Sequence, residues 1–392
     1  MIPENVTPRH IAKAMGIAEE EVFERARKID EWFLQSFDSY IGGKIREIDP
    51  PTQLGKYHLR RLARWAAKEL PLHSNAHGSV TRRSPITAAR RHLGHRIVIT
   101  RDVSDCFPSV TSEMFFEEMR ALGFRADVAH LLTSLMLLRG RLPQGSPASN
   151  AALNLFFYRT DVAITDAVGR IGGRYTRYCD DLVVSVNEKH RVQQAEAILD
   201  DAINALGLRV NEKKKLQRGV QGLESIRIVN GVKVNSPSHT QMTKSRWRKL
   251  LRVCKKYVPA AQSVNCRNLN RLAKRRRVLE GHCQWARLFD RAPLREMRAF
   301  LESGDLAVDA RLKKAGIAVN GKWWQKNKAS DAGKRYALEW RERSLGRWPK
   351  ATSSVKMPVS KPTVASIEAG NNAAAPNTTD TETADEDSAR QP

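Results

Sequence analysis

The stretch RYTRYCDDLVVSV, residues 174–186, contains two runs rich in β-branched and aromatic residues, 174–178 and 182–186. Only Cys179, Asp180 and Asp181 separate the two runs. A connection this short between two strand-like runs predicts an antiparallel hairpin. The hairpin would carry two adjacent carboxylates at its tip, where like charges repel and lose hydration. A divalent cation would relieve that repulsion.

Further elements are expected on both sides of this hairpin. The run HRIVITRDV, residues 95–103, predicts a buried strand that ends near the carboxylate of Asp102. The pattern also predicts a helix from Thr111, a long helix over 149–168, a helix over 190–206 that ends at Gly207, and a strand over 208–210. This order of strands and helices predicts an α+β fold, with helices on one face of a sheet.

Length and composition limit the class of protein. The chain has 392 residues, of which 41% are hydrophobic, enough for two or three packed units. No segment has the roughly 20 uncharged apolar residues of a membrane-spanning helix, and the N-terminus lacks the order of a signal peptide. The five cysteines include no C-x-x-C pair, which argues against a disulfide framework or a zinc site. We therefore expect a soluble, intracellular protein with reduced thiols.

The formal net charge of +25 is distributed unevenly. Residues 56–101 hold eleven basic side chains and one acidic, and residues 241–280 hold thirteen and one. Both blocks also carry apolar and aromatic residues at helical spacing, so that one face could pack while the other meets phosphate. Residues 351–392 carry three basic and six acidic side chains and no aromatic residue, which predicts disorder. The folded part is therefore expected to bind a polyanion.

Three carboxylates could form one site. If Asp102 lies beside the hairpin tip, it joins Asp180 and Asp181 in a set of hard oxygen ligands that suits Mg²⁺. Two such ions, about 3.5–4 Å apart, stabilise both the attacking and the leaving oxygen in phosphoryl transfer. An exposed Asp-Asp turn is the alternative, and the apolar strands on both sides of the turn favour the metal site.

These residues resemble the sequence boxes of reverse transcriptases. The run YCDD at 178–181 is similar to their Y-x-D-D box, DVSDCF at 102–107 to the D-x-x-D-x-Phe/Tyr box, and LPQGSP at 142–147 to the L-P-Q-G box. The run GLRVNEKK at 207–214 resembles the G-x-x-x-N-x-x-K stretch, and GKIREI at 43–48 resembles the fingers segment G-K-x-R-x-I. All the main boxes occur in the order of the family, over roughly residues 40–235.

The likeness extends to the bacterial retron reverse transcriptases. The runs NAHGSV at 75–80, RSPI at 83–86 and AARRH at 88–92 resemble their A-H-G-F, R-S-I and N-A-x-x-H segments. The run DCFPSV at 105–110 resembles their D-F-F-P-S-I. Two places depart from the pattern: VNG stands at 229–231 where retron enzymes have V-T-G, and Ala88 stands where they have Asn.

The resemblance implies a right-hand polymerase with fingers, a ferredoxin-like palm and a helical thumb. Its parts would be an N-terminal helical segment (1–35), the fingers and palm (36–235), a basic helical thumb with a C-terminal extension (236–350) and a disordered tail (351–392). The activity implied is that of an RNA-directed DNA polymerase in the bacterial cytoplasm. In a retron it would make RNA-linked single-stranded DNA, called msDNA, for anti-phage defence.

The resemblance also implies partners and site residues. The partners are a structured noncoding RNA that serves as template and primer, dNTPs, the DNA product and a retron effector protein. The cofactor is a pair of Mg²⁺ ions, which Mn²⁺ could replace. The site residues are Asp102, Asp180 and Asp181 for catalysis and metal binding, Val103 through its carbonyl as a further metal ligand, Lys44, Arg46, Asp105, Phe107, Gln144 and Lys214 for the nucleotide, and Lys274, Arg275, Arg276 and Arg277 for nucleic acid.

Phe107 bears on the choice of substrate. In reverse transcriptases an aromatic ring at this position packs under the sugar and clashes with a 2′-hydroxyl, and a phenyl ring cannot hydrogen-bond that hydroxyl, so the resemblance implies DNA synthesis. Several alternatives remain open. Lys44 and Arg46 could be a solvated pair, Asp105 a helix cap and Phe107 a core residue. The enzyme could also be of the group II intron or diversity-generating type, or a non-catalytic RNA-binding protein on a polymerase scaffold. Three converging acids argue against the last of these.

Overall fold

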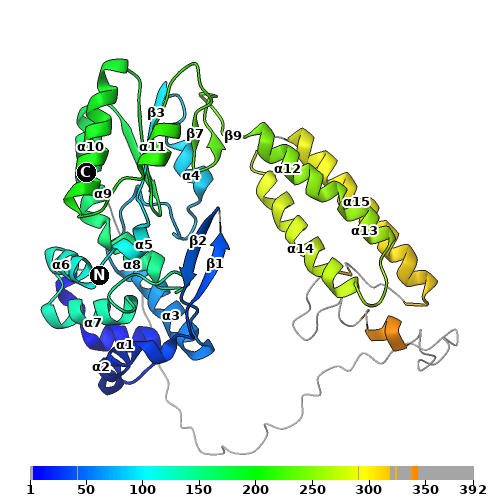
Figure 1. Cartoon of the computed structure of the whole chain (residues 1–392), viewed down its shortest axis with the longest axis horizontal. Coiled ribbons are helices and arrows are strands. Elements are labelled where there is room, and N and C mark those ends of the chain that lie inside the picture. Colours follow the sequence, from blue (N-terminus) through cyan, green and yellow to red (C-terminus); the bar gives the residue numbers. More distant parts are fainter. Residues whose placement is uncertain are drawn as a thin grey trace, which may run out of the picture.

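The predicted hairpin lies in a four-stranded antiparallel sheet of the computed structural model, in the body that also contains α10 (Val192–Ala205) and α11 (Glu212–Arg218) (Figure 1). Tyr178 pairs with Asp181, so the loop of the hairpin is only two residues long, Cys179 and Asp180. The register of the central strand places Asp102 directly opposite Asp181. The strands, in the spatial order β4-β5-β3-β6, are β3 (Ile97–Asp102), β4 (Arg174–Tyr178), β5 (Asp181–Val186) and β6 (Val220–Gln221).

The structure describes residues 3–41, 43–289, 291–317, 323–324, 336 and 338–342. The predicted disordered tail, 351–392, lies outside them. Within the described residues, every helix is too short or too polar to cross a lipid bilayer. All five cysteines are free thiols, as expected.

Helices of the palm surround the sheet, and most lie where the sequence predicted them. Thr111 caps α6, because its side-chain oxygen accepts a hydrogen bond from the backbone N–H of Met114 at 3.2 Å. The helix predicted over 190–206 is confirmed, and Gly207 follows it at φ 73°. These helices are α4 (Pro85–Arg90), α5 (Cys106–Ser109), α6 (Ser112–Ala121), α7 (Ala126–Met136), α8 (Ser149–Phe156), α9 (Tyr158–Arg170), the short η3 (Lys189–Arg191), α10 (Val192–Ala205) and α11 (Glu212–Arg218).

Two predicted elements differ from the structure. The long helix over 149–168 is divided into α8 and α9 at Phe157. Neighbouring helix residues point about 100° apart, and the break lets the rings of both Phe156 and Phe157 reach the core, where they meet edge to face at 5.5 Å. The strand predicted over 208–210 is reduced to one bridge, between Val103 and Val210, because the chain turns into α11 immediately afterwards.

The N-terminal part of the chain contains the helical segment predicted over 1–35 and the hairpin and long helix of the predicted fingers. Its two-stranded hairpin pairs Phe37 with Ile48 and Ser39 with Arg46. Leu59 and Leu62 lie on the buried side of the long helix that follows the hairpin, which packs against α1 and α8. The elements are η1 (Pro3–Asn5), α1 (Pro8–Met15), α2 (Glu19–Arg27), η2 (Ile29–Trp32), β1 (Phe37–Ile41), β2 (Lys44–Ile48) and α3 (Gln53–Glu69).

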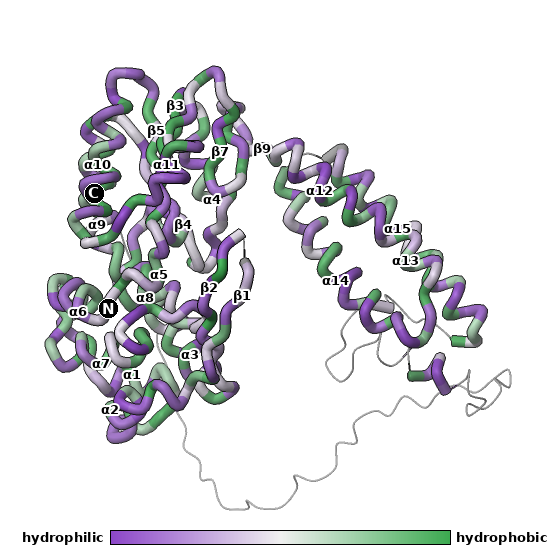
Figure 2. Tube along the Cα trace, in the orientation of Figure 1, coloured by the Kyte–Doolittle hydropathy of each residue, from purple (hydrophilic) through white to green (hydrophobic). Residues whose placement is uncertain are grey.

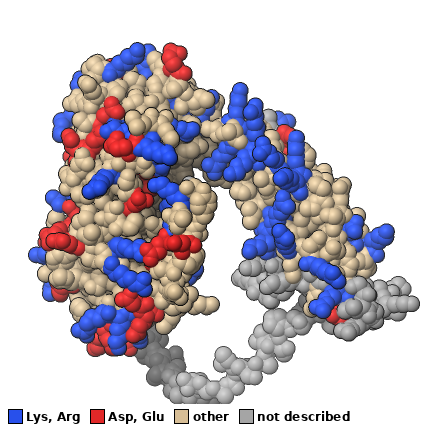
Figure 3. Space-filling view, viewed as in Figure 1, with Lys and Arg blue, Asp and Glu red and all other residues tan. Residues whose placement is uncertain are grey.

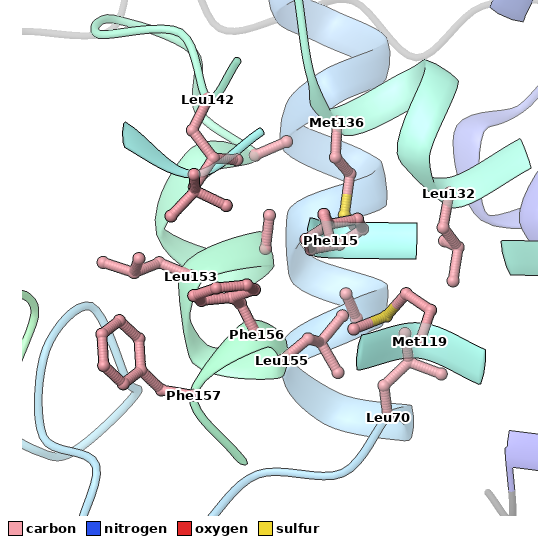
Figure 4. Close-up of a cluster of buried hydrophobic side chains, with 14 of the residues drawn as sticks. Leu70, Phe115, Met119, Leu132, Met136, Leu142, Leu153, Leu155, Phe156 and Phe157 are labelled. Carbon is pink, nitrogen blue, oxygen red and sulfur yellow. The ribbon is translucent and has the colours of Figure 1, made fainter. Parts of the chain in front are cut away.

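One hydrophobic core joins the fingers and the palm. Figure 4 shows the part of it where side chains from α3, α6, α7 and α8 meet around Phe115. Each fully buried Phe, Leu or Met contributes about 1.5–3 kcal/mol relative to an exposed side chain. The labelled residues of this cluster are Leu70, Phe115, Met119, Leu132, Met136, Leu142, Leu153, Leu155, Phe156 and Phe157.

The predicted thumb forms a second helical body with a core of its own (Figure 1). Hydrophobic and hydrophilic residues alternate along its helices (Figure 2), as expected where one side of each helix is buried. Trp323 and Trp324, whose role the sequence left open, are buried in this core. The helices of this body are α12 (Lys244–Lys255), α13 (Tyr257–Gln262), α14 (Leu269–Ala286) and α15 (Arg291–Lys314). A small sheet precedes them, made of β7 (Ile228–Val229), β8 (Val232–Lys233) and β9 (Gln241–Met242), and Val229 and Val232 of this sheet pack against Ile86 and Val98 of the palm.

A buried ion pair anchors the hairpin β4–β5 to α9. The guanidinium of Arg177 donates to both carboxylate oxygens of Asp161, at 2.9 and 2.7 Å, and both side chains are fully buried. The hydroxyl of Tyr175 donates to the same carboxylate at 2.8 Å. Arg177 also donates to the carbonyl oxygen of Cys179 at 3.0 Å, so the pair reaches the loop of the hairpin.

We predict that Asp161→Asn destabilises the protein by about 3–5 kcal/mol, because it leaves the Arg177 charge buried without its partner. Urea unfolding followed by circular dichroism measures the change. The matched control is Glu24→Gln, which removes an exposed partner of Lys28 and should leave the unfolding midpoint unchanged. An Asp161→Asn variant that unfolds at the wild-type midpoint would show that the pair does not hold the hairpin.

Candidate active site

The structure brings together the three carboxylates that the sequence predicted to converge. Asp102 ends β3, Asp180 lies in the two-residue loop, and Asp181 begins β5. One oxygen from each carboxylate lies within 4.8 Å of the others. The loop turns tightly because Cys179 takes a positive φ of 56°. Val103 lies beside the three acids, where its backbone N–H donates to the carbonyl oxygen of Asp180 at 3.3 Å.

Burial and mutual repulsion raise the pKa values of Asp180 and Asp181. Burial, followed by the charges of Asp180 and Asp102, raises the pKa of Asp181 to about 7. Burial and the Asp102 carboxylate likewise raise the pKa of Asp180, while Lys214 and Arg46 oppose the rise. Added positive charge stabilises carboxylates that are crowded together in this way. The donor set, all hard oxygen ligands, fits a divalent metal ion.

Asn211, which caps α11, and Lys214 of α11 hold Asp102 in place. The side-chain amide of Asn211 donates to one carboxylate oxygen at 2.9 Å, and its backbone N–H donates to the carbonyl oxygen of Asp102 at 2.7 Å. The ammonium group of Lys214 contacts the other carboxylate oxygen. Burial lowers the pKa of Lys214, but the three acids outweigh it and the net shift is upward. Lys214, predicted to bind the nucleotide, therefore also supplies positive charge to the carboxylates.

The predicted fingers residues also lie near the site. Lys44 and Arg46 alternate with Ile45 on β2, so their side chains share one face of the hairpin. The ammonium nitrogen of Lys44 lies 3.7 Å from a carboxylate oxygen of Asp105. Asp105 adopts a left-handed conformation with φ 42° and makes no side-chain hydrogen bond to α5, so the helix-cap alternative is not realised.

Gln144 and Gly145 lie on the loop before α8 and contact the end of the fingers hairpin. The backbone N–H of Asp49 donates to the carbonyl oxygen of Gln144 at 2.7 Å, and the Gln144 N–H donates to the Asp49 carboxylate at 3.2 Å. Gly145 has φ +128°, and a Cβ there would lie 2.8 Å from the Asp49 carbonyl oxygen. Glycine is therefore required, and the loop and the fingers are held in close contact.

Phe107 lies on α5, directly after the turn that follows Asp102. Its ring is half-buried and packs against the main hydrophobic core. The ring is neither fully buried nor fully exposed, so its position agrees both with a nucleotide-binding residue and with a core residue.

The four basic residues predicted on the thumb separate into two groups. Lys274 is exposed and Arg275 half-exposed, whereas the guanidinium of Arg277 donates to the carbonyl oxygen of Trp324 at 2.9 Å. The prediction for Arg276 is wrong. Its guanidinium is buried, pairs with Asp305 and Glu280 at 2.9 and 2.8 Å, and lies 4.0 Å from the centre of the Trp324 ring.

The periodicity of the helix explains why Arg276 is buried while Lys274 is exposed. Four consecutive residues span more than one turn of α14, so one of them must point into the bundle beside Leu272 and Leu279. The surface of the thumb remains strongly basic. On the face shown in Figure 3, Lys and Arg side chains gather over the thumb helices with few acidic side chains among them.

Comparison with known proteins agrees with this arrangement. Residues 41–222 match the family described as reverse transcriptase (RNA-dependent DNA polymerase). The chain is 33% identical over 215 residues to the retron Mx65 reverse transcriptase of Myxococcus xanthus, which covers 50% of this chain and 49% of the relative. It is 34% identical over 146 residues to the retron Ec86 reverse transcriptase of Escherichia coli, covering 36% and 46%.

Among solved structures, apo telomerase from Candida tropicalis aligns with a TM-score of 0.41 and 11% identity, over 81% of this chain and 66% of that chain. The family match over residues 41–222 makes this segment similar to a reverse transcriptase domain. The similarity to two retron enzymes supports the bacterial retron type that the sequence motifs indicated. The chain spans about half the length of these two curated relatives.

Three features of the site were not among the predicted site residues. Asn211 belongs to the quoted G-x-x-x-N-x-x-K stretch. Its position three residues before Lys214 could have indicated that it lies at the same site. Arg177 is a charged residue in a strand-like run, which could have indicated a buried ion pair. Asp49, fully buried against the loop of Gln144, gave no signal, because an Asp before two prolines is typical of an ordinary turn.

We predict that Asn211→Ala lowers the affinity for divalent metal about 10- to 100-fold, the usual effect of removing a hydrogen bond that orients a ligand. Isothermal titration with Mg²⁺ or Mn²⁺ measures it. The matched control is Thr243→Ala, which removes a comparable cap from α12 and should leave metal affinity unchanged. Equal affinities for Asn211→Ala and the wild type would exclude a positioning role.

Proposed function

We propose that this protein is a reverse transcriptase of the retron type, which extends a DNA strand on an RNA template. The observation that carries the proposal is the convergence of Asp102, Asp180 and Asp181 at the hairpin tip of a reverse transcriptase domain. A non-catalytic scaffold would have no need to keep three converging acids that repel one another.

The residues around the carboxylates have distinct proposed roles. Two Mg²⁺ ions held by the three aspartates and the carbonyl of Val103 would supply positive charge to the phosphoryl group in transfer, and Mn²⁺ could replace them. Lys44 and Arg46 would bind the triphosphate of the incoming nucleotide, one as a point charge and one as a bidentate fork. Lys214, kept protonated by its acidic neighbours, would donate a hydrogen bond to the leaving pyrophosphate.

A basic groove extends from the carboxylates toward the thumb. A cavity of about 360 Å³ is lined by Asp102, Asp181 and Lys214. It adjoins a larger cavity of about 800 Å³ lined by Arg246, Lys249 and His282 and by no acidic residue. Three residues line both cavities, namely Arg218, Ile228 and Gly231. We propose that the template–primer duplex lies along this groove, with Lys274 and Arg275 of the thumb near its backbone.

The retron assignment adds specific partners. Its support is the similarity to retron enzymes over about half of their length. A structured noncoding RNA would provide the template and a 2′-hydroxyl primer, dNTPs would be the substrates, and the product would be single-stranded DNA linked to that RNA. Residues 36–235 would act as fingers and palm, and residues 236–350 as thumb. The enzyme would serve anti-phage defence in the bacterial cytoplasm, together with an effector protein.

The deciding experiment is to sequence the nucleic acid that copurifies with the wild type and with an Asp180→Ala variant. We expect a branched RNA–DNA hybrid with the wild type alone, since Asp180→Ala removes a metal ligand. Linear complementary DNA would favour a group II intron or diversity-generating enzyme instead. RNA without DNA in both samples would contradict the polymerase function and favour an RNA-binding protein.

We predict that Phe107→Ala lowers the discrimination against ribonucleotides by about 10- to 100-fold, the range typical when a steric block in a binding pocket is lost. Single-nucleotide incorporation with dNTPs and rNTPs measures kcat/KM for each. Phe107→Tyr, which keeps the ring, is the control and should retain discrimination. Unchanged selectivity in Phe107→Ala would assign the ring to the core alone.

A further inference from the structure

We infer that Lys215 is a positioning residue that fixes α11 and thereby keeps Lys214 on the carboxylate of Asp102. It acts through a buried ion network that Asp200 and Arg101 form on the other face of the sheet. The inference rests on the proposed polymerase function, because Lys214 is the group that we propose for the leaving pyrophosphate. The exposure of α11, the ion network, and the directions of two adjacent lysines support it.

The helix that carries Lys214 lacks a hydrophobic anchor. None of the seven residues of α11 is buried, and its one large apolar side chain, Leu216, is 86% exposed. Helices shorter than about 12 residues are marginal in water unless an apolar face packs against the rest of the protein. Polar contacts must therefore hold α11 in place.

Backbone contacts with β3 hold the two ends of α11. Because β6 pairs with only two residues of β3, α11 lies beside the last residues of β3, where a longer strand would continue. The backbone N–H of Thr100 donates to the carbonyl oxygen of Gly219 at 2.8 Å, and its hydroxyl donates to that of Arg218 at 3.0 Å. At the other end, Asn211 bonds to Asp102. The turn between these ends, which carries the lysines, is left to side-chain contacts.

The side-chain support is an ion network on the opposite face of β3. Arg101 precedes Asp102 on the strand, so the two side chains point to opposite faces of the sheet. The fully buried guanidinium of Arg101 donates to two carboxylates of α10, Asp200 at 2.5 Å and Glu196 at 2.6 Å. The ammonium group of Lys215 donates to the second carboxylate oxygen of Asp200 at 3.0 Å. Lys215 thus links α11 to a carboxylate that the core already fixes.

The electrostatics of Asp200 favour this link. Burial raises the pKa of Asp200, but hydrogen bonds from Arg101 and Lys215 outweigh burial, so the net shift is downward. The carboxylate therefore stays ionised at neutral pH and remains a partner for Lys215. Arg101 keeps both Asp200 and Glu196 without any help from Lys215. Loss of the Lys215 charge therefore leaves the buried guanidinium paired, and the fold should tolerate it.

Two adjacent lysines divide the contacts of α11 between them. Neighbouring residues of a helix point about 100° apart, so one turn directs Lys214 to the catalytic carboxylates and Lys215 to α10. Lys214, Gln217 and Arg218 share a face of α11 and line the cavity of about 360 Å³ beside those carboxylates. Because both lysines leave the same turn, an anchor at Lys215 fixes the direction of Lys214 and of this face.

The test uses Lys215→Met and Lys214→Met, alone and together. Methionine has a helix propensity close to that of lysine and removes the charge. The matched control is Lys213→Met, at an exposed neighbour outside the network, and Lys215→Arg keeps the charge. Single-nucleotide incorporation on an RNA template gives kcat and the KM for the dNTP. Hydrogen exchange of the α11 amides reports the anchoring without any activity, and thermal unfolding reports the stability of each variant.

We expect Lys215→Met to lower kcat by about 10- to 100-fold, the scale of loss when a reacting group is misplaced. The KM should stay nearly unchanged, because the pyrophosphate needs the lysine only in the transition state. Lys215→Arg should restore most of the rate. In the Lys214→Met background, Lys215→Met should cost little more, since both changes remove one interaction. The α11 amides should exchange faster in Lys215→Met than in Lys213→Met.

Wild-type kcat or unchanged exchange of the α11 amides in Lys215→Met would overturn the inference. So would a full additional loss in the double variant, which would show that Lys215 acts independently of Lys214. A Lys215→Met protein that unfolds at a much lower temperature than Lys213→Met would assign the ion pair to the stability of the fold instead. A wild type that extends no primer, together with faster α11 exchange in Lys215→Met, would contradict the proposed polymerase function alone.

Discussion

The repulsion among three carboxylates at one hairpin tip is the constraint on which the rest of the structure depends. Asp102 and Asp181 are directly opposite each other in the sheet, and Asp180 lies in the loop between the strands. Strand pairing fixes this crowding, so the surrounding elements must compensate for it. Positive charge arrives from Lys214 of α11 and from Arg46 of β2, both of which lower the pKa of Asp180 against its burial.

Each restraint on the site comes from a different part of the chain. Asn211 fixes the orientation of Asp102 from one side of the sheet. Arg177 and Asp161 hold the hairpin from beneath, and Gly78 packs on the loop from the fingers. A site assembled in this way is preorganised, because its ligands are held before substrate or metal binds.

The elements that could be predicted from sequence are those whose signal is local. The hairpin follows from two strand-like runs beside a short turn, and the start of α6 follows from a single capping residue, Thr111. The break at Phe157 and the contact of Asp49 with Gln144 depend on partners far away in the chain, which no local pattern contains. Arg276 was misplaced for the same reason, since its partner Asp305 lies on another helix.

The basic residues that give the chain its net charge of +25 therefore have several separate roles. Arg101, Arg177 and Arg276 are buried and paired with carboxylates, so they contribute to folding and not to a surface potential. Lys44 and Lys214 are paired with acids beside the site, where an incoming phosphate or metal can compete for them. Only basic side chains that are exposed and lack a carboxylate partner are free to neutralise phosphate without first breaking an internal contact. The net charge alone thus predicts the class of partner, a polyanion. The pairing of each basic side chain within the fold determines which surfaces can bind that partner.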